Sequence, residues 1–284
     1  MAVVFLIGGT GNQLFQYATS APADRFSALF LRPGVCRLLG WTPHDRAFGF
    51  PAAPGWAVAG ALLLLLLDLA LARTLRLSLF TDFDNRLANC QPRLRRLLAF
   101  GYFQKRPRTR DTAWIRAEIA PPPPPILPIH IRGGDLRTAD RMATHRYGVL
   151  PDSYYSRILQ QAAADGALEG LTEAQVFTDD PAHARRIMEG LALPLPCRIE
   201  AGPLDEMLRR CLGAEVFVAS NSTLAWWIVE LRGPQASSYA PRPFHRGSPV
   251  RTQDWARTVR PYYPDPRRTP GLRAAPSRPP RPDT

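Results

Sequence analysis

A run of five prolines at residues 121–125, followed by Pro128, constrains this chain more than any other feature. Proline fixes one backbone torsion and lacks an amide donor, so such a run cannot lie inside a helix or a central strand. We therefore expect a stiff hinge that divides the 284 residues into two halves. Each half is long enough to build a hydrophobic core of its own.

The first half opens on a pattern typical of a βαβ unit. Residues 3–7 are apolar and rich in β-branched side chains, which predicts a buried strand. The three glycines at residues 8–11 predict a turn, and Asn12 is expected to cap a helix that begins near Gln13. Leu14 occupies the third glycine position of a dinucleotide fingerprint, which argues against NAD. The turn still suits backbone amides that approach an anion.

An apolar run of eleven residues, 57–67, is ended by Asp68. Crossing a bilayer takes about 20 residues, so we expect a buried helix here and no transmembrane segment. Helical periodicity is also visible at residues 62–77 and 87–98. The N-terminus lacks the charged region of a signal peptide.

The second half alternates expected strands with expected helices. Strands are expected at residues 126–131, 174–177 and 214–219, and helices at 153–164, 180–189, 205–211 and 223–231. This alternation predicts an α/β fold of two doubly wound, Rossmann-like domains that face one cleft. We expect an N-terminal domain at 1–125, a C-terminal domain at 126–250 and a largely disordered tail at 251–284.

Polar side chains follow these strands at the ends where open α/β sheets bind ligands. His130, Arg132 and Asp135 lie at the C-terminal end of the first strand. Arg132 suits a bidentate grip on a diphosphate, and a plain ion pair with Asp135 is the alternative. Asp179 and Asp180 follow the next strand and suit hydrogen bonds from a ribose or a purine, although Asp180 is equally suited to cap a helix.

Residues 220–223, Ser-Asn-Ser-Thr, stand where the last expected strand gives way to an apolar helix. Their hydroxyls and backbone amides suit an anion, because a helix start has unpaired amide donors. The alternative is an ordinary helix cap without a ligand. Trp226 and Trp227 are expected to be core residues.

The formal net charge of +12 is concentrated in the tail. Residues 241–284 hold ten arginines, three aspartates and 11 of the 30 prolines, a composition typical of a disordered appendage. An arm that binds nucleic acid or anionic lipid is the alternative function. The four cysteines form no CxxC pair, which suits a reducing cytosol and argues against structural zinc.

Six segments, taken together and in order, resemble the alpha-1,2-fucosyltransferases of glycosyltransferase family 11. They lie within residues 1–20 and 98–231. The segments are 8–18 (GGTGNQLFQYA), 101–104 (GYFQ) with 115–116 (IR), 130–135 (HIRGGD) with the tyrosine pair at 154–155, 176–181 (VFTDDP), 205–207 (DEM) with Cys211, and 219–227 (ASNSTLAWW).

The resemblance implies a GT-B type fold, GDP-β-L-fucose as the donor, inversion at the anomeric carbon, and no required metal or other cofactor. The acceptor would be the 2-OH of a terminal galactose on a glycan or surface polysaccharide, and no nucleic acid is implied. Bacterial members work in the cytoplasm, so we expect a cytoplasmic enzyme, with peripheral contact at the inner face of the membrane as an option. The alternative is a nucleotide-sugar-binding relative that lacks transferase activity.

The resemblance also assigns roles to residues. The candidate catalytic residues are Arg132, His130 and Asp135. Arg132 would hold the diphosphate, and no general base stands out beyond the candidate Asp135. The family usually has a second arginine where this chain has Gly133. The donor would be bound by Gly9, Gly11, Asn12, Gln13, Asp179, Asp180, Asn221, Ser222 and Thr223.

Overall fold

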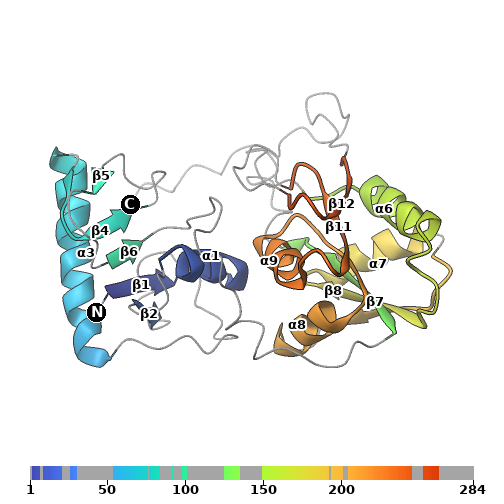
Figure 1. Ribbon diagram of the computed structural model, residues 1–284. Coiled ribbons are helices and arrows are strands. Elements are labelled where there is room, and N and C mark those ends of the chain that lie inside the picture. The colour runs from blue at the N-terminus through green and yellow to red at the C-terminus, as the bar shows by residue number, and fades with distance from the viewer. Residues whose placement is uncertain are drawn as a thin grey trace, which may run out of the picture. The chain divides into compact units, whose positions relative to one another are not determined.

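The computed structural model describes residues 2–6, 9–20, 26–30, 54–75, 77–83, 91–92, 98–100, 125–134, 149–191, 193–200, 204–244 and 252–261. The chain forms two compact units, Met1–Ile119 and Ala120–Thr284, so the boundary falls within a few residues of the proline run. Both units are mixed α/β and both contain a parallel sheet (Figure 1).

The first unit contains a parallel sheet in the order β2-β1-β6-β4. Its strands are β1 (Ala2–Leu6), β2 (Phe26–Phe30), β4 (Thr81–Phe83) and β6 (Leu98–Phe100). Strand β1 is the expected opening strand, and it leads into helix α1 (Thr10–Ser20). Leu6, Leu14 and Phe15 are fully buried, so α1 packs its apolar side into this unit.

The start of α1 differs from the sequence prediction. Thr10 and Gly11 are already helical, and the amides of Asn12 and Gln13 donate to the carbonyl of Gly9 at 2.9 and 3.2 Å. Asn12 therefore lies inside the first turn and does not cap a helix that begins at Gln13.

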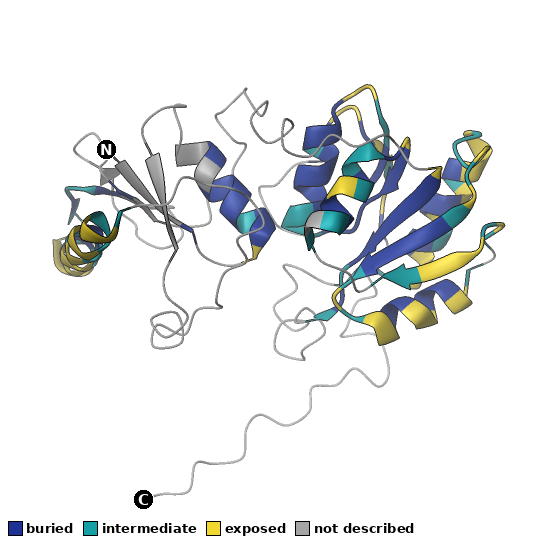
Figure 2. Cartoon of the chain, turned by 90° about the horizontal axis from the view of Figure 1, so that it is seen from below, coloured by how far each residue is buried: buried dark blue, intermediate teal, exposed yellow. Residues whose placement is uncertain are grey.

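Helix α3 (Gly55–Leu75) corrects the prediction of a buried helix. The apolar run at 57–67 is only the middle of a 21-residue helix, and by length and composition this helix could cross a membrane. Within it, Ala61, Leu65 and Asp68 are buried, whereas most of the other side chains are exposed (Figure 2). The apolar run alone is too short to cross a bilayer, but the helix continues through Asp68 to Leu75.

Asp68 stays inside α3 because the chain that follows satisfies its carboxylate. The backbone amides of Leu79, Phe80 and Thr81 donate to it at 3.0, 2.8 and 2.6 Å, and the Ser78 hydroxyl donates at 3.1 Å. Burial acts to raise the pKa of Asp68, but these hydrogen bonds outweigh it and hold the pKa below 3.8.

The helix expected at residues 62–77 is wrong at its C-terminal end, and the helix expected at 87–98 is wrong at residues 91–92 and 98. Leu77 lies in β3 (Leu77–Ser78), which pairs in parallel with β5 (Gln91–Pro92). Residue 98 begins β6. Leucine-rich spacing of this kind fits a helix and a short buried strand equally well, and flanking residues decide.

The second unit is built on a six-stranded parallel sheet in the order β12-β11-β10-β7-β8-β9. If β7 to β12 are numbered 1 to 6 in chain order, the strands run 3-2-1-4-5-6 from the β9 edge of the sheet. This is the order of a dinucleotide-binding Rossmann sheet. The strands are β7 (Ile126–Ile131), β8 (Glu173–Thr178), β9 (Cys197–Glu200), β10 (Val216–Val218), β11 (Ser237–Pro241) and β12 (Arg257–Val259).

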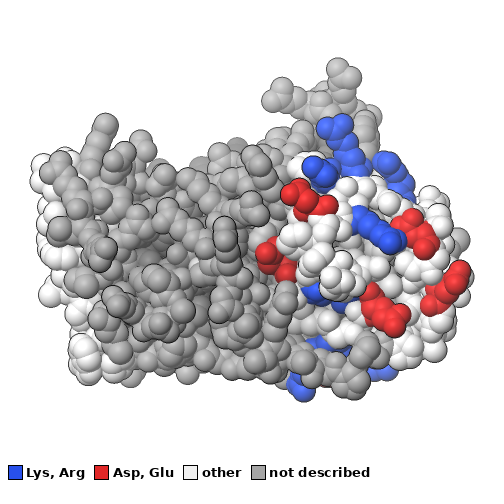
Figure 3. Space-filling model, viewed as in Figure 1, with Lys and Arg blue, Asp and Glu red and all other residues white. Residues whose placement is uncertain are grey.

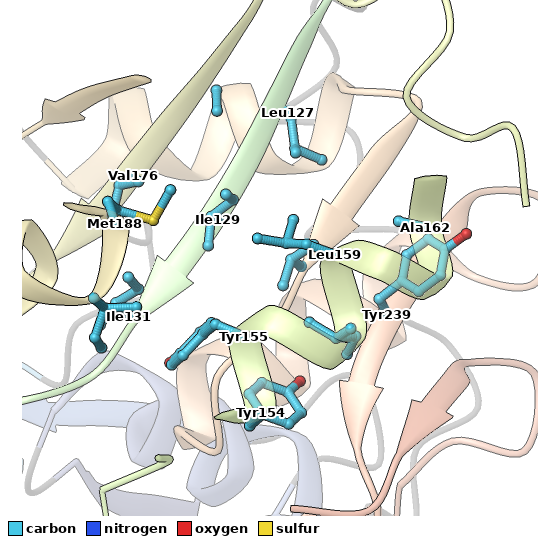
Figure 4. Close-up of a cluster of buried hydrophobic side chains, with 14 of the residues drawn as sticks. Leu127, Ile129, Ile131, Tyr154, Tyr155, Leu159, Ala162, Val176, Met188 and Tyr239 are labelled. Carbon is cyan, nitrogen blue, oxygen red and sulfur yellow. The ribbon is translucent and has the colours of Figure 1, made fainter. Parts of the chain in front are cut away.

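Helices cover both faces of this sheet (Figure 1). They are α6 (Asp152–Ala164), α7 (Pro181–Glu189), α8 (Leu204–Gly213) and α9 (Thr223–Arg232). Helices α6 and α7 pack on one face over Ile129, Ile131 and Val176, where a cluster of buried hydrophobic side chains lies (Figure 4). The four helices begin and end close to where the sequence predicts them.

Pro128 contradicts the expectation that no proline lies in a central strand. It occupies β7, opposite Gln175 of β8. Strand β10, on the other side of β7, has three residues, and its register with β7 is the pair Val218 and Ile129. Because so short a neighbour needs few amide donors from β7, the missing donor of Pro128 costs little.

The sheet also extends past the expected domain boundary at residue 250. Strand β12 lies in the segment predicted as a disordered tail, and Arg257 on it donates to Asp165 at 2.7 Å and to the Tyr239 hydroxyl at 2.8 Å. Tyr239 in turn donates to Asp165 at 2.8 Å, and burial first of all raises its pKa to about 12. Residues 262–284 lie outside the described part of the chain.

Candidate functional site

Strands β7 and β10 are neighbours in the sheet, but their following helices lie on opposite faces. This is the topological switch point, and open α/β sheets bind ligands where the loops after two such strands diverge. The loop after β7 carries Arg132, Gly133 and Gly134, and the loop after β10 carries residues 219–222. The described members of the expected site in the second unit therefore lie at the end of the sheet that binds ligands in such folds.

A direct contact joins the two loops. His130 Nδ1 lies 2.7 Å from Ser220 Oγ, and both side chains are buried. Burial, with a smaller contribution from the charge of Arg132, lowers the pKa of His130 to about 3. His130 is therefore neutral at physiological pH, and it is too weak a base to take a proton from a sugar hydroxyl.

The loop after β10 is a tight entry into α9. The Ser222 amide donates to Ser220 Oγ at 3.2 Å, and the Ser222 hydroxyl accepts from the Ala225 amide at 3.0 Å. Ser222 is thus the N-cap, as the cap interpretation of this segment predicts, and Thr223 is the first helical residue. The helix start points its amides and positive dipole end toward this edge of the sheet.

Tyr154 supports the loop after β10. The sequence indicated this residue only as part of the tyrosine pair at 154–155 and not by its role. Its hydroxyl donates to the carbonyl of Ala219 at 2.8 Å, immediately before the Ser220 loop. The ring is fully buried and packs edge-on against Tyr155. Helix α6 therefore holds Ala219, the residue that follows β10, in place.

Arg132 forms an ion pair, but its described partner is Asp179. The two oxygens of the Asp179 carboxylate are used separately: one accepts from Arg132 and the other accepts from the Gly133 amide at 2.9 Å. Asp135, the other expected partner of Arg132, lies outside the described residues. The guanidinium remains one-third exposed, so part of it faces solvent.

Asp179 reaches the loop after β7 because that loop has no side chains in the way. A Cβ at Gly134 would lie 2.3 Å from Asp179 Oδ2, and Gly134 has a φ of +33°. A Cβ at Gly133 would lie 2.8 Å from Asp180 Cβ and 3.1 Å from the His183 ring. Any residue larger than glycine at these two positions would require the β8 loop to move.

The surroundings of Gly133 exclude a larger residue at this position. An arginine cannot be placed there without moving Asp180, because the added Cβ alone would lie 2.8 Å from the Asp180 Cβ. Asp180 lies against Gly133 and Asp179 lies against Gly134, so the two aspartates after β8 occupy the space that side chains at these glycines would need.

Asp180 is the N-cap of α7. Its carboxylate accepts from the His183 amide at 3.0 Å, and its own amide donates to the Thr178 hydroxyl at 3.0 Å. This is the helix-cap alternative that the sequence left open. One oxygen of Asp179 and one of Asp180 are thus already used by backbone amides.

The expected donor-binding residues of the first unit lie at the start of α1. Gly9 is exposed, Asn12 is partly exposed, and Gly11 and Gln13 are buried. They follow β1, at the ligand-binding edge of their own sheet. In the second unit, Asn221 is buried whereas Ser222 and Thr223 are partly exposed.

No group of three potential metal ligands gathers anywhere in the described ranges. On the visible face of the second unit, basic and acidic side chains are interspersed and form no large patch of one sign (Figure 3). The described part of the site thus presents a cationic arginine, a helix start and a neutral imidazole.

Comparisons with known proteins give weak likenesses only. No protein-family model matches the chain, and no curated protein matches it. Among solved structures, the chain is similar to the Escherichia coli heptosyltransferase WaaC with ADP, at 10% identity and a TM-score of 0.44 over 91% of this chain and 92% of that one. E. coli ADP-heptose LPS heptosyltransferase II gives 12% identity, a TM-score of 0.44, and 91% and 90% coverage.

POFUT1 in complex with GDP is a third similar structure, at 18% identity and a TM-score of 0.28. The match covers 44% of this chain, and the chain spans 43% of the POFUT1 chain.

Proposed function

We propose that this protein is a GT-B type glycosyltransferase that transfers L-fucose from GDP-β-L-fucose to the 2-OH of a terminal galactose. The observation that carries the proposal is the contact between His130 and Ser220 at the switch point of the second unit. It joins 130–135 and 219–227, two of the six segments whose sequences resemble alpha-1,2-fucosyltransferases. Two motifs 90 residues apart in the sequence thus form one edge of one sheet.

The chemistry of this edge suits a departing nucleoside diphosphate. When the bond between the fucose anomeric carbon and the β-phosphate oxygen breaks, negative charge develops on GDP. Arg132 supplies a cation for that charge, and the Ser222 hydroxyl with the amides at the start of α9 supplies hydrogen-bond donors. The acceptor 2-OH oxygen forms the new bond from the opposite side of the sugar, which inverts the anomeric configuration.

His130 acts in this proposal as a positioning residue. The Ser222 amide donates to Ser220 Oγ, so the Ser220 hydroxyl is available to donate its proton to His130 Nδ1. That arrangement leaves the imidazole proton on Nε2 and fixes the Ser220 loop against β7. His130 then sets the distance between Arg132 and the start of α9, while Asp135 remains the candidate that takes the acceptor proton.

Asp179 supports a second candidate function, a nucleotide-sugar-binding protein without transferase activity. Its carboxylate neutralises Arg132, and the Gly133–Asp180 contact leaves no room for the second arginine of the family pattern. A diphosphate must therefore compete with Asp179 for Arg132. A protein that binds the donor and does not turn it over would fit this arrangement.

The test is GDP release from GDP-fucose with and without a panel of β-galactosides. We expect acceptor-dependent release from the full chain, and a fall of roughly 10²- to 10³-fold in kcat for Arg132→Ala, because the lost cation acts mainly in the transition state. Arg198→Ala is the matched control: Arg198 also pairs with a carboxylate of the same unit, Glu200, but on strand β9. It should retain full activity.

Asp179→Asn tests the competition for Arg132. In a transferase this substitution weakens the competition and lowers the KM for GDP-fucose, with turnover retained. For the unchanged chain, GDP-fucose binding by calorimetry with no release of GDP on any acceptor would support the binding protein and overturn the transferase. If neither binding nor turnover is detected, both functions are wrong.

A further inference from the structure

The outward face of helix α3 is the largest feature that the proposed function does not use. Its buried residues, Ala61, Leu65 and Asp68, lie on one side of the helix. The 100° rotation per residue places Leu63, Leu66 and Ala70 on the opposite side. Leu63 and Leu66 are 70% and 61% exposed, and Trp56, at the N-terminal end of the same face, is 77% exposed (Figure 2).

This face carries no charged side chain over four turns. Between Trp56 and Ala70 the exposed residues are apolar or glycine, over a length of roughly 20 Å. The charged residues of the helix are Asp68, turned inward and hydrogen-bonded by three backbone amides, and Arg73, exposed in the last turn. A helix that is apolar on all sides requires an apolar environment on each of them.

We propose that α3 binds the surface of an anionic phospholipid bilayer, lying along it with Leu63, Leu66 and Leu67 immersed in the acyl chains. Trp56 at one end and Arg73 at the other are the residue types that favour the interface between headgroups and hydrocarbon. Arg76 follows directly, and residues 1–119 hold 15 basic and seven acidic side chains, an excess that favours anionic lipid.

The helix lies on the bilayer and does not cross it. Its Asp68 carboxylate is bound to the backbone of residues 79–81, so crossing would carry this polar turn into hydrocarbon or strip the carboxylate of its partners. Lying along the interface leaves the Asp68 side docked on its own unit and immerses only the opposite side.

The experiment is flotation of the full chain with phosphatidylcholine vesicles, with and without phosphatidylglycerol, at about 0.15 M salt. We expect flotation with the anionic vesicles, and a partition coefficient at least roughly tenfold lower for a variant with Leu63→Gln, Leu66→Gln and Leu67→Gln. Arg73→Gln should lower binding to anionic vesicles by a smaller factor. Far-ultraviolet circular dichroism establishes that each variant is folded.

The matched control is Trp255→Gln, which removes an exposed large apolar side chain from the second unit and should leave flotation unchanged. The proposal is overturned if the full chain does not float with anionic vesicles, or if the triple variant floats as well as the parent. It is also overturned if the triple substitution only abolishes a lipid-free dimer, because a second copy of the chain then covers this face. The readout is lipid binding, so it is independent of the transferase test.

Discussion

Helices α3 and α9 are both strongly apolar and each contains one buried charged residue, yet they lie in opposite surroundings. Seven of the ten residues of α9 are buried, including Trp227 and Ile228, whereas α3 buries three residues along 21. Arg232 of α9 donates to the carbonyls of Cys211, Ala214, Glu215 and Ser237 and to the Ser238 hydroxyl. Asp68 of α3 accepts from amides.

The comparison teaches that the buried charged residue determines which side of each helix faces the rest of its unit. Arg232 binds the end of α8 and the strand that follows α9, so α9 is fixed among elements that bury the remaining sides. Asp68 binds only the turn that follows its own helix, which fixes one side and leaves the other outward. The predictions below test this difference, from the largest expected effect to the smallest.

Replacing Arg232 should have the largest effect on stability. Arg232→Leu leaves several buried carbonyls without donors and should lower the free energy of unfolding by about 3–5 kcal/mol. Burial lowers the pKa of Arg232 to about 10, so the residue is charged at neutral pH. Urea unfolding measures the loss, and Arg232→Lys should restore part of it. A loss below about 1 kcal/mol would mean that Arg232 does not organise this region.

Asp68→Ala should cost less, about 2–4 kcal/mol, because fewer groups lose a partner and the turn lies nearer solvent. Asp68→Asn keeps an acceptor oxygen and should cost about half as much. Hydrogen exchange should rise in peptides covering residues 77–83 and stay unchanged in the second unit. Equal loss of protection in both units would contradict this separation.

Acid should destabilise the second unit before the first. The folded pKa of His130 is about 3 and its ordinary value is 6.5, so below pH 6.5 the unfolded chain binds a proton that the folded chain does not. Stability is therefore full above pH 6.5 and falls by up to about 1.4 kcal/mol per pH unit below it. Asp68 contributes stability that is lost only below pH 3.8, since its pKa is lowered.

Urea midpoints at several values between pH 7.5 and 4.5, read by pulsed hydrogen exchange for each unit, measure this order. His130→Gln is the control and should flatten the pH dependence of the second unit. Acid destabilisation that begins in the first unit would contradict the burial of His130.

The smallest effect is expected on the outward face of α3. In lipid-free buffer, Leu66→Gln should change the free energy of unfolding by no more than about 0.5 kcal/mol, because the side chain is already exposed. Ile228→Gln, at a fully buried position of α9, should cost several times more. A large loss for Leu66→Gln would mean that this face packs against protein.

The second unit was largely predictable because its strands and helices carry strong local signals. Buried strands β7, β8 and β10 are short apolar runs, and helices α7 and α9 begin at residues that cap them, Asp180 and Ser222. Strands β9, β11 and β12 were missed because only part of each is apolar. Strand β12 also lies within the proline- and arginine-rich residues 241–284, a composition that predicts disorder and hides the strand pattern.

The candidate site was predictable residue by residue but not in its pairings. Positions 130, 132 and 220–223 could be identified because they lie at or just after the C-terminal ends of strands. The partner of Arg132 depends on β7 and β8 being neighbours, and on two glycines that let Asp179 approach. The role of Tyr154 depends on α6 packing next to β10. Such contacts are set by tertiary structure, which local sequence does not encode.

The strand order of the second unit has a consequence for how this protein folds during synthesis. Central strand β7 ends at Ile131, but its neighbour β10 and the Ser220 partner of His130 come 90 residues later. At roughly 5–20 residues per second, β7 waits about 5–20 s on the ribosome with one edge unpaired. During that interval β8 can protect only the other edge, so the nascent chain depends on chaperones more than a sheet assembled in sequence order would.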